Sequence, residues 1–104
     1  MTNNNTYTPH KWLVIDCGND FYKVFAVWSG GYLDGDSWKL NSGIKNAEDM
    51  GDHYIIHGYS TSKYKCYKKN YGTNIYGTSL LSNMESTILS NTQTESLLKT
   101  FIKK

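Results

Sequence analysis

The chain has 104 residues, enough for one domain but not for two. Only 38% of its residues are hydrophobic, so its aromatic side chains, which bury roughly 150–250 Å² each, must supply much of the core. All 11 basic residues are lysine, which excludes the planar guanidinium fork that grips phosphate with two hydrogen bonds. The sequence contains no nucleophile motif, phosphate-binding loop or metal-ligand signature, so it predicts neither an enzyme nor a cofactor.

The net charge of +2 hides an uneven distribution along the chain. Residues 1–52 carry a net charge of −3, whereas residues 53–104 carry +5. A chain polarised in this way can meet an anion with one half, or associate with a second copy of itself.

The two cysteines, Cys17 and Cys66, lie about fifty positions apart. The longest apolar run covers the five residues 24–28, fewer than a signal peptide or a membrane helix requires. We therefore expect a cytoplasmic protein that makes no membrane contact and keeps both thiols reduced. A disulfide bond between them remains an alternative if the two strands that carry them are neighbours.

The first part of the chain predicts an arm followed by a hairpin. Residues 1–9 are polar and rich in asparagine, which predicts a disordered N-terminal arm ahead of a single domain over residues 10–104. Residues 11–16 and 21–28 are apolar on both faces and flank a Gly-Asn turn. This pattern predicts an antiparallel hairpin at the centre of a sheet.

Shorter strands follow. Residues 37–40 predict a third strand, and the acidic stretch 45–52 predicts an exposed loop. Residues 53–59 and 63–69 predict two more strands, joined by a turn at residues 60–62.

Beyond Gly72 the apolar residues recur every three or four positions, which is typical of helices. A first helix is predicted over residues 78–90. The side chains expected to face the sheet are Leu81, Met84 and Ile88. A second helix, over about residues 93–103, would begin with a capping box formed by Thr92 and Glu95.

Strands therefore come first and helices last, which predicts the α+β class: a small antiparallel sheet of about five strands with one or two C-terminal helices packed on it. Apolar residues on at least three strands should form its core. Those expected to be largely buried are Trp12, Val14, Phe25, Val27, Trp38 and Ile55.

Several segments together resemble a family of small tailed-bacteriophage proteins. They are the run GGYLDGDSWKLNSGI at residues 30–44, the acidic loop that follows, YSTSKYKCYKKNYG at residues 59–72 and YGTSLLSNM at residues 76–84. The resemblance covers roughly residues 10–90. The chain departs from the family at residues 60–63, where the family tends to have a tighter turn containing glycine. The resemblance implies a phage or prophage origin and little about mechanism.

One stretch of the chain concentrates positive charge and tyrosine. It contains Lys63, Tyr64, Lys65, Tyr67, Lys68 and Lys69. Alternating lysines and aromatic rings are typical of single-strand nucleic-acid binders. They are also typical of an edge strand whose lysines prevent aggregation. The isoelectric point of about 8.5 lies below the range above 9 that is usual for nucleic-acid binders, which favours the edge-strand interpretation.

Two polar turns ringed by aromatic residues form a second candidate site. The candidate ligand- or partner-binding residues there are Tyr32, Trp38, Asn41 and Ser42. The same residues could simply enclose a small core. His53 and His57 would share one face of a strand at a separation of about 13 Å, too far apart to bind one metal ion, so no metal site is predicted.

The leading hypothesis is a phage accessory protein that acts by stoichiometric binding. It would inhibit a host defence or regulatory protein, or sequester a small nucleotide signal. The alternative is a single-stranded nucleic-acid-binding protein that uses the lysine–tyrosine strand.

The sequence also predicts a homodimer, because so small a sheet would leave apolar surface uncovered. The residues expected at the interface are Leu97, Leu98, Phe101 and Ile102. The alternative is that the last helix folds back onto the sheet.

Overall fold

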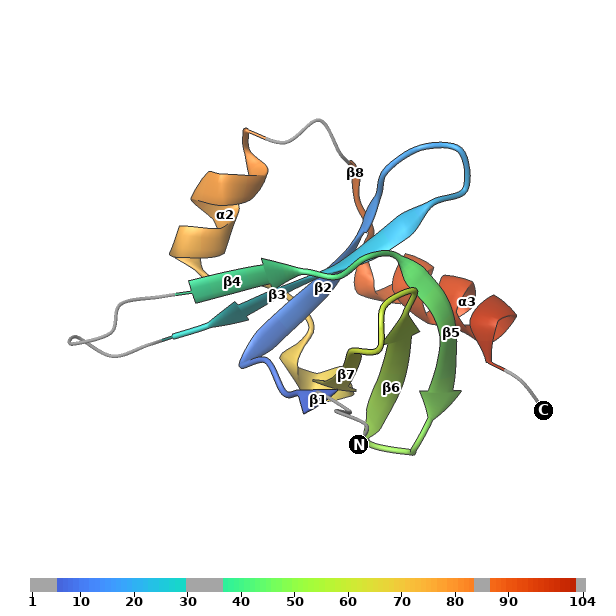
Figure 1. The fold of residues 1–104 in the computed structure, drawn as a ribbon. Coiled ribbons are helices and arrows are strands. Elements are labelled where there is room, and N and C mark those ends of the chain that lie inside the picture. Colours follow the sequence, from blue (N-terminus) through green and yellow to red (C-terminus); the bar gives the residue numbers. More distant parts are fainter. Residues whose placement is uncertain (1–5, 30–36, 84–86, 103–104) are drawn as a thin grey trace.

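The computed structural model describes residues 6–29, 37–83 and 87–102 and shows an α+β protein, as the sequence predicts (Figure 1). Within these residues the strands form two sheets of four strands each, and two α-helices lie towards the C-terminus. The fold class is thus confirmed, although the strands are divided between two sheets rather than gathered in one sheet of about five.

The elements follow one another along the chain. The strands are β1 (Thr6–Tyr7), β2 (Lys11–Asp16), β3 (Tyr22–Trp28), β4 (Ser37–Leu40), β5 (Ile44–Asp49), β6 (His53–Gly58), β7 (Lys63–Tyr67) and β8 (Thr87–Ile88). The helices are the 3₁₀ helix η1 (Lys68–Asn70), α2 (Ile75–Leu81) and α3 (Asn91–Phe101). The first sheet has the strand order β1-β7-β6-β5, and the second has the order β4-β3-β2-β8.

The hairpin β2–β3 occupies the two inner positions of the second sheet, which confirms the predicted central pair of buried strands. Its register pairs Trp12 with Ala26 and Val14 with Val24. Because four consecutive residues are buried in each strand, the hairpin is covered on both faces. Figure 1 shows the first sheet on one side of this hairpin and α2 on the other.

These two faces contribute to two separate cores. The core between the sheets contains Trp12, Val14, Val24, Ala26, Ile44, Ala47, Tyr54, Ile56, Tyr64, Cys66 and Leu98. The core beneath α2 contains Leu13, Ile15, Phe25, Val27 and Leu81. The first sheet therefore buries one face, and the other face is turned outward.

A hydrogen-bonded tyrosine joins distant parts of the first core. The Tyr71 hydroxyl accepts from the backbone N–H of Val14 at 3.1 Å and donates to the carbonyl of Leu89 at 2.7 Å. It also lies 2.5 Å from the Thr94 hydroxyl on α3. Burial raises the pKa of the Tyr71 phenol because it removes the charged form from water, while the hydrogen bonds with Thr94 and Val14 act in the opposite direction.

The N-terminal arm is shorter than predicted. Thr6 and Tyr7 form β1, which pairs in parallel with Lys63 and Tyr64 of β7, and Pro9 is fully buried. The prediction of a disordered arm is therefore wrong for residues 6–9, because aromatic packing of Tyr7 against Tyr64 and Trp28 holds this segment. Residues 1–5 lie outside the described part of the chain.

The acidic stretch predicted to be a loop contains β5. A bulge between Ile44 and Asn46 breaks the alternation, so the two inward residues Ile44 and Ala47 are three positions apart instead of two. The prediction of an exposed loop over residues 45–52 rested on its three acidic residues and Gly51, and it is wrong for residues 45–49, which belong to β5.

The predicted helix over residues 78–90 is also wrong. The helix is α2, which begins earlier, at an N-cap where the Asn74 side chain accepts from the N–H of Gly77. Leu81 does face the second core, whereas Ile88 is half exposed in β8, where it pairs with Ile15 of β2. Met84 lies outside the described residues.

Gly77 lets this short helix approach the sheet, since a Cβ there would lie 3.1 Å from both Phe25 and Val27.

The second predicted helix is confirmed as α3, with a different cap. The capping box is formed by Ser90 and Gln93 instead of Thr92 and Glu95. The four residues expected at a dimer interface pack into the first core: Leu97, Leu98, Phe101 and Ile102. The helix folds back onto the sheets, so the proposed interface patch is wrong, and self-association stays a prediction without a located surface.

Two of the six predicted core residues are not buried. Trp38 lies on the outer strand β4, stacks on Phe25 at 5.7 Å and keeps 40% of its surface exposed. Ile55 points to the outward face of the first sheet and is half-buried, while its neighbour Ile56 is fully buried. The remaining predicted core residues are buried.

Candidate ligand-binding site

The outward face of the first sheet carries most of its polar side chains. Along β6 and β7 buried and half-buried residues alternate, because successive strand side chains point to opposite faces. The side chains on the outward face of these two strands are His53, Ile55, His57, Lys63, Lys65 and Tyr67. Cross-strand pairing places His57 opposite Lys63, Ile55 opposite Lys65 and His53 opposite Tyr67.

The predicted lysine–tyrosine strand is split by this alternation. Tyr64 is 2% exposed in the first core and cannot stack on a nucleic-acid base. Lys63, Lys65 and Tyr67 do share the outward face, where the Lys65 ammonium lies 5.2 Å from the centre of the Tyr67 ring. Only part of the predicted platform is therefore available to a ligand.

Lys68 and Lys69 do not extend the strand, since the chain turns into η1 after Tyr67. The Lys68 ammonium lies 2.9 Å from an Asp49 carboxylate oxygen and 4.8 Å from the centre of the Tyr54 ring. This hydrogen bond lowers the pKa of Asp49 and raises the pKa of Lys68. Lys68 thus has a partner within the protein, while Lys69 is exposed.

The edge-strand interpretation holds for only part of β7. This strand is flanked by β6 on one side and by β1 on the other. Its pairing with β1 covers Lys63 and Tyr64, so β7 is an inner strand there, and only residues 65–67 lie beyond the paired stretch. The lysine at position 63 therefore cannot be explained as protection of a bare edge.

The second predicted site has mainly structural roles. Asn41 is buried, and its side-chain oxygen accepts from the N–H groups of Val24 and Gly43. Ser42 is exposed, and its hydroxyl accepts from the N–H of Ser60 at 3.0 Å. Asn41 thus holds the turn before β5 against β3, and Ser42 links it to the turn between β6 and β7. Tyr32 lies outside the described residues, and Trp38 packs on Phe25.

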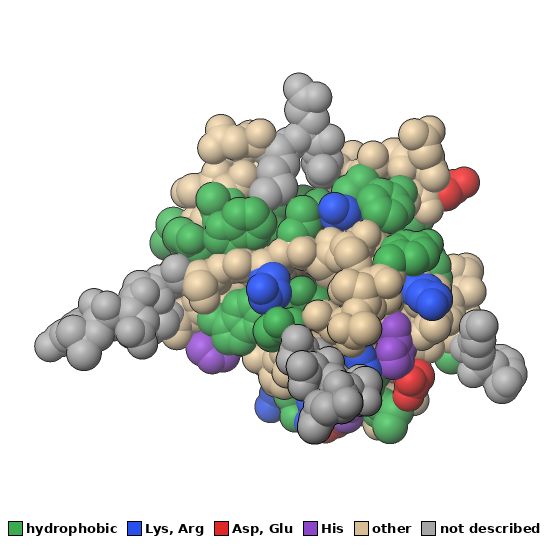
Figure 2. Space-filling model, viewed as in Figure 1, with side chains coloured by type: hydrophobic (Ala, Val, Ile, Leu, Met, Phe, Trp, Pro, Cys, Tyr) green, Lys and Arg blue, Asp and Glu red, His purple; other side chains and the backbone are tan. Residues whose placement is uncertain are grey.

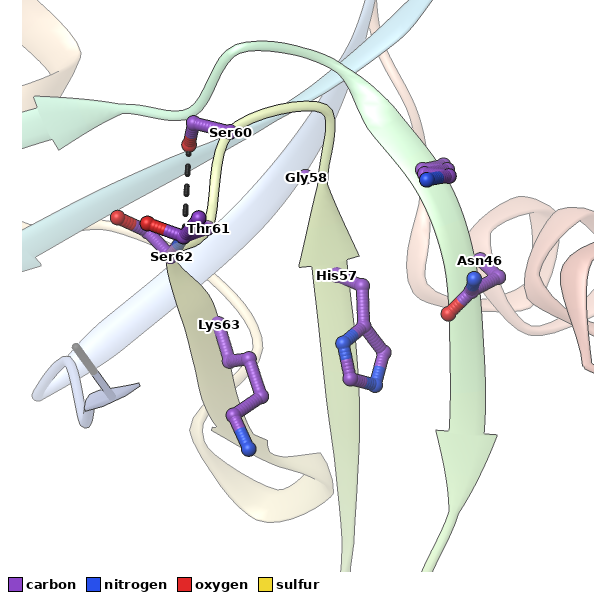
Figure 3. A pocket seen from close by; sticks show the side chains of 8 residues that line it. Asn46, His57, Gly58, Ser60, Thr61, Ser62 and Lys63 are labelled. Carbon is purple, nitrogen blue, oxygen red and sulfur yellow. Dashed lines mark hydrogen bonds between the residues drawn. The ribbon is translucent and has the colours of Figure 1, made fainter. Parts of the chain in front are cut away.

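The geometry points instead to a polar pocket at one end of the outward face (Figure 3). It has a volume of about 280 Å³. It is lined by Lys45, Asn46, His57, Gly58, Ser60, Thr61, Ser62 and Lys63. Figure 3 shows His57 on β6 between Lys63 on β7 and Asn46 on β5, with the turn of residues 60–62 at one end of these strands.

The bulge in β5 contributes a cation to this pocket. Lys45 lies between Ile44 and Asn46, at the position where the register of β5 and β6 shifts. Bulges are common beside functional sites because they turn a side chain in a direction that regular pairing would not allow. No described carboxylate lies within ion-pair distance of Lys45 or Lys63. The pocket is therefore lined by two lysines that form no ion pair with a described carboxylate.

The turn at residues 60–62 offers hydroxyl groups beside these ammonium groups. The backbone N–H of Ser62 donates to the Ser60 hydroxyl at 3.4 Å, and the N–H of Gly58 donates to the carbonyl of Ser62 at 3.3 Å. Together with the bond from Ser60 to Ser42, these contacts hold the turn in place. Hydroxyls and ammonium groups at fixed positions are suited to bind an anion.

His57, which lines the pocket, pairs with a carboxylate that lies outside the pocket lining. The Nε2 atom of His57 lies 2.7 Å from a Glu48 carboxylate oxygen. His57 and Asn46 also line an adjacent hollow of about 300 Å³, together with Ala47 and Glu48. His57 thus lies between a pocket that is lined by lysines and a hollow that is lined by the carboxylate of Glu48.

Metal binding and thiol chemistry find no support in this region. Within residues 6–29, 37–83 and 87–102, no group of three or more His, Cys, Asp or Glu side chains could hold a metal ion. His53 bonds to Asp52 and His57 to Glu48, each separately. Both cysteines are free: Cys17 is exposed, and burial raises the pKa of the Cys66 thiol well above its usual value.

Comparisons of the chain with models of known families, with curated proteins and with solved structures found no match. None of the helices in the described part of the chain is long and apolar enough to cross a membrane. The pocket residues come from segments that sequence reasoning treated separately, namely a loop, a turn and a strand. Of the residues that line the pocket, only Lys63 is among the binding residues predicted from the sequence.

Proposed function

We propose that the protein is a phage accessory protein that sequesters a small phosphorylated molecule, a nucleotide signal, in the host cytoplasm. The observation that carries this proposal is the pocket lined both by Lys45 and Lys63, which have no ion-pair partner among the described residues, and by the hydroxyl-bearing residues 60–62. Phosphate oxygens accept hydrogen bonds from both kinds of group, and lysine binds phosphate as a point charge.

The distribution of charge favours a small anion over a long one. Figure 2 shows lysine side chains scattered singly over the face in view, with no continuous basic stripe among the residues drawn in colour. The pocket volume of about 280 Å³ is just below the range of roughly 300–1,000 Å³ that encloses drug-sized ligands. A phosphate-bearing part of a ligand fits such a volume, with the remainder outside it.

The side chains of the pocket favour binding over catalysis. A serine nucleophile needs a hydrogen bond to a base, and a histidine is the usual one. Among the described residues, His57 makes its side-chain hydrogen bond to Glu48 and none to a pocket hydroxyl. The Ser60 hydroxyl accepts from the backbone of its own turn. These contacts hold the polar groups in place without activating one of them.

Titration calorimetry with pyrophosphate at low salt tests the proposal. We expect binding by the full chain, weakened about tenfold or more by Lys45→Gln and by Lys63→Gln, since each removes a charged hydrogen bond worth roughly 1.5–3 kcal/mol. Lys99→Gln, an exposed lysine of α3, is the matched control and should bind unchanged. No binding at about 1 mM, which corresponds to roughly 4 kcal/mol, would contradict the proposal. Inhibition of a host defence or regulatory protein would then be the form of stoichiometric binding to test.

A second candidate function is single-strand nucleic-acid binding. It is favoured by the shared outward face of Lys63, Lys65 and Tyr67 on β7. Binding of a fluorescent oligothymidine should then fall with a slope of log K against log salt of roughly −1.4 for two lysine–phosphate contacts. Lys65→Gln should halve this slope, while it should leave pyrophosphate binding unchanged because Lys65 does not line the pocket.

A further inference from the structure

Two aromatic rings lie exposed beside the end of the first sheet. Tyr59, which directly follows β6, keeps 62% of its surface exposed, and Phe21 of the β2–β3 turn keeps 36%. Their ring centres are 6.4 Å apart, and the ring planes are inclined by 31°. The Lys23 ammonium lies 5.6 Å from the centre of the Phe21 ring. These rings come from segments 38 positions apart and meet at the surface instead of in either core.

The rings are held in position by a glycine beneath them. Gly43 has a φ of +126°, and a Cβ there would lie 2.5 Å from the Cε1 atom of Phe21 and 3.0 Å from the Cδ2 atom of Tyr59. No other residue fits without displacing the rings. The close packing of both rings over this backbone restricts their motion, so the exposed aromatic surface is preformed.

The aromatic pair is connected to the polar pocket through the backbone of Tyr59, although neither ring is part of the pocket lining. Tyr59 lies between Gly58 and Ser60, both of which line the pocket. Gly43 lies two residues before Lys45, so their Cα atoms are at most roughly 7 Å apart. The hydrogen bond from Ser60 to Ser42 ties these two segments together. A ligand whose anionic part occupies the pocket would therefore extend towards the rings.

We propose that the Phe21–Tyr59 pair binds the nucleobase of a nucleotide whose phosphates occupy the pocket of Lys45 and Lys63. This inference rests on the proposed function and names the part of the ligand that remains outside the pocket. A base is flat and apolar on its faces, so it stacks on an aromatic ring, and the exposed face of Tyr59 is available for it. A sugar or an aliphatic phosphate ester would gain little from this surface.

The test compares ligands with and without a base on the full-length protein. Adenosine, guanosine, cytidine and uridine 5′-diphosphates are titrated alongside pyrophosphate and ribose 5-phosphate. We expect at least one nucleotide to bind roughly 5- to 150-fold more tightly than pyrophosphate, the gain that one stacked base provides. A Tyr59→Phe variant, which keeps a ring, should retain the preference.

Variants separate the two parts of the site. Tyr59→Leu should reduce nucleotide affinity to the level of pyrophosphate and leave pyrophosphate binding unchanged, whereas Lys63→Gln should weaken both ligands. Tyr76→Leu, a tyrosine of α2 on the far side of the second sheet, is the control and should alter neither. Circular dichroism confirms that each variant is folded.

The outcomes distinguish this inference from the proposed function. If pyrophosphate binds and no nucleotide binds more tightly, the base site is refuted while the phosphate pocket stands. If Tyr59→Leu weakens pyrophosphate as much as nucleotides, the ring merely supports the turn, and the base site is likewise refuted. If neither pyrophosphate nor any nucleotide binds, both proposals fail together.

Discussion

The hairpins β2–β3 and β6–β7 are both antiparallel strand pairs, but the first is covered on both faces and the second on one face. In β2–β3 consecutive residues are buried, because the first sheet covers one face and α2 covers the other. In β6–β7 buried and half-buried residues alternate, because nothing in the described part of the chain covers the outward face. A hairpin covered on both faces has only core residues, so it contributes to stability and not to binding. In a hairpin covered on one face, alternate residues belong to the core and to an exposed surface that can bind a ligand.

The largest effects should come from neighbouring residues of β3. Phe25→Ala should lower the free energy of unfolding by about 3–5 kcal/mol, and Val24→Ala by roughly 2 kcal/mol or more, because each leaves a cavity in a different core. Urea denaturation measures both. A small loss at either position would show that one face of β3 is not packed as described.

Neighbouring residues of β6 should behave differently. Ile56→Ala should cost about 2–5 kcal/mol, since Ile56 is fully buried, whereas Ile55→Ala should cost less than about 1 kcal/mol on the outward face. Both substitutions remove the same atoms from adjacent positions, so the difference reports the surroundings alone. Equal losses in urea denaturation would mean that the outward face is covered, for instance by a second copy of the chain.

The sequence predicted β2–β3 well and β6–β7 only in part, for a physical reason. An unbroken apolar run identifies a strand buried on both sides without further information. Alternation shows that a strand has two kinds of face, but Tyr64 and Tyr67 are the same residue type, and only the packing reveals which one is buried. The Lys45 bulge and the turn at residues 60–62 meet through tertiary contacts between β5, β6 and β7, so no local pattern predicted the pocket.

An inward tyrosine of β7 should make the protein sensitive to alkali. Burial raises the pKa of Tyr64 from 10.0 to about 12. The unfolded chain therefore loses this proton at lower pH than the folded chain does, so the stabilisation is complete below pH 10 and is lost as the pH rises towards 12. The loss should be on the order of 2 kcal/mol.

Tyr64→Phe keeps the ring and removes the titrating group. Its free energy of unfolding should fall less steeply between pH 10 and 12 than that of the natural chain, as measured by urea denaturation at a series of pH values. Parallel curves for the two proteins would show that the phenol of Tyr64 is not the group responsible. The buried Tyr71, whose pKa is also raised, would then be the next group to replace.

The smallest loss of stability is expected when the ion pair between Asp49 and Lys68, just beyond β7, is removed. Asp49 accepts from the N–H of Gly51 at 2.9 Å and from the Lys68 ammonium at 2.9 Å. Asp49→Asn keeps an oxygen for Gly51 and removes only the charge, so it should cost roughly 0.2–1 kcal/mol, as is usual for an exposed pair. Because the pKa of Asp49 is lowered in the folded protein, this stabilisation is present above about pH 4 and is lost as the pH falls further.

Asp16 offers a matched control for this last substitution. It accepts from the N–H of Gly18 at 2.8 Å in the same local geometry and forms no ion pair with a described lysine. Asp16→Asn should therefore leave the free energy of unfolding nearly unchanged, and added salt should shrink the cost of Asp49→Asn without affecting Asp16→Asn. A similar, salt-independent cost at both positions would mean that the turn hydrogen bonds, and not the charge of Lys68, account for the loss.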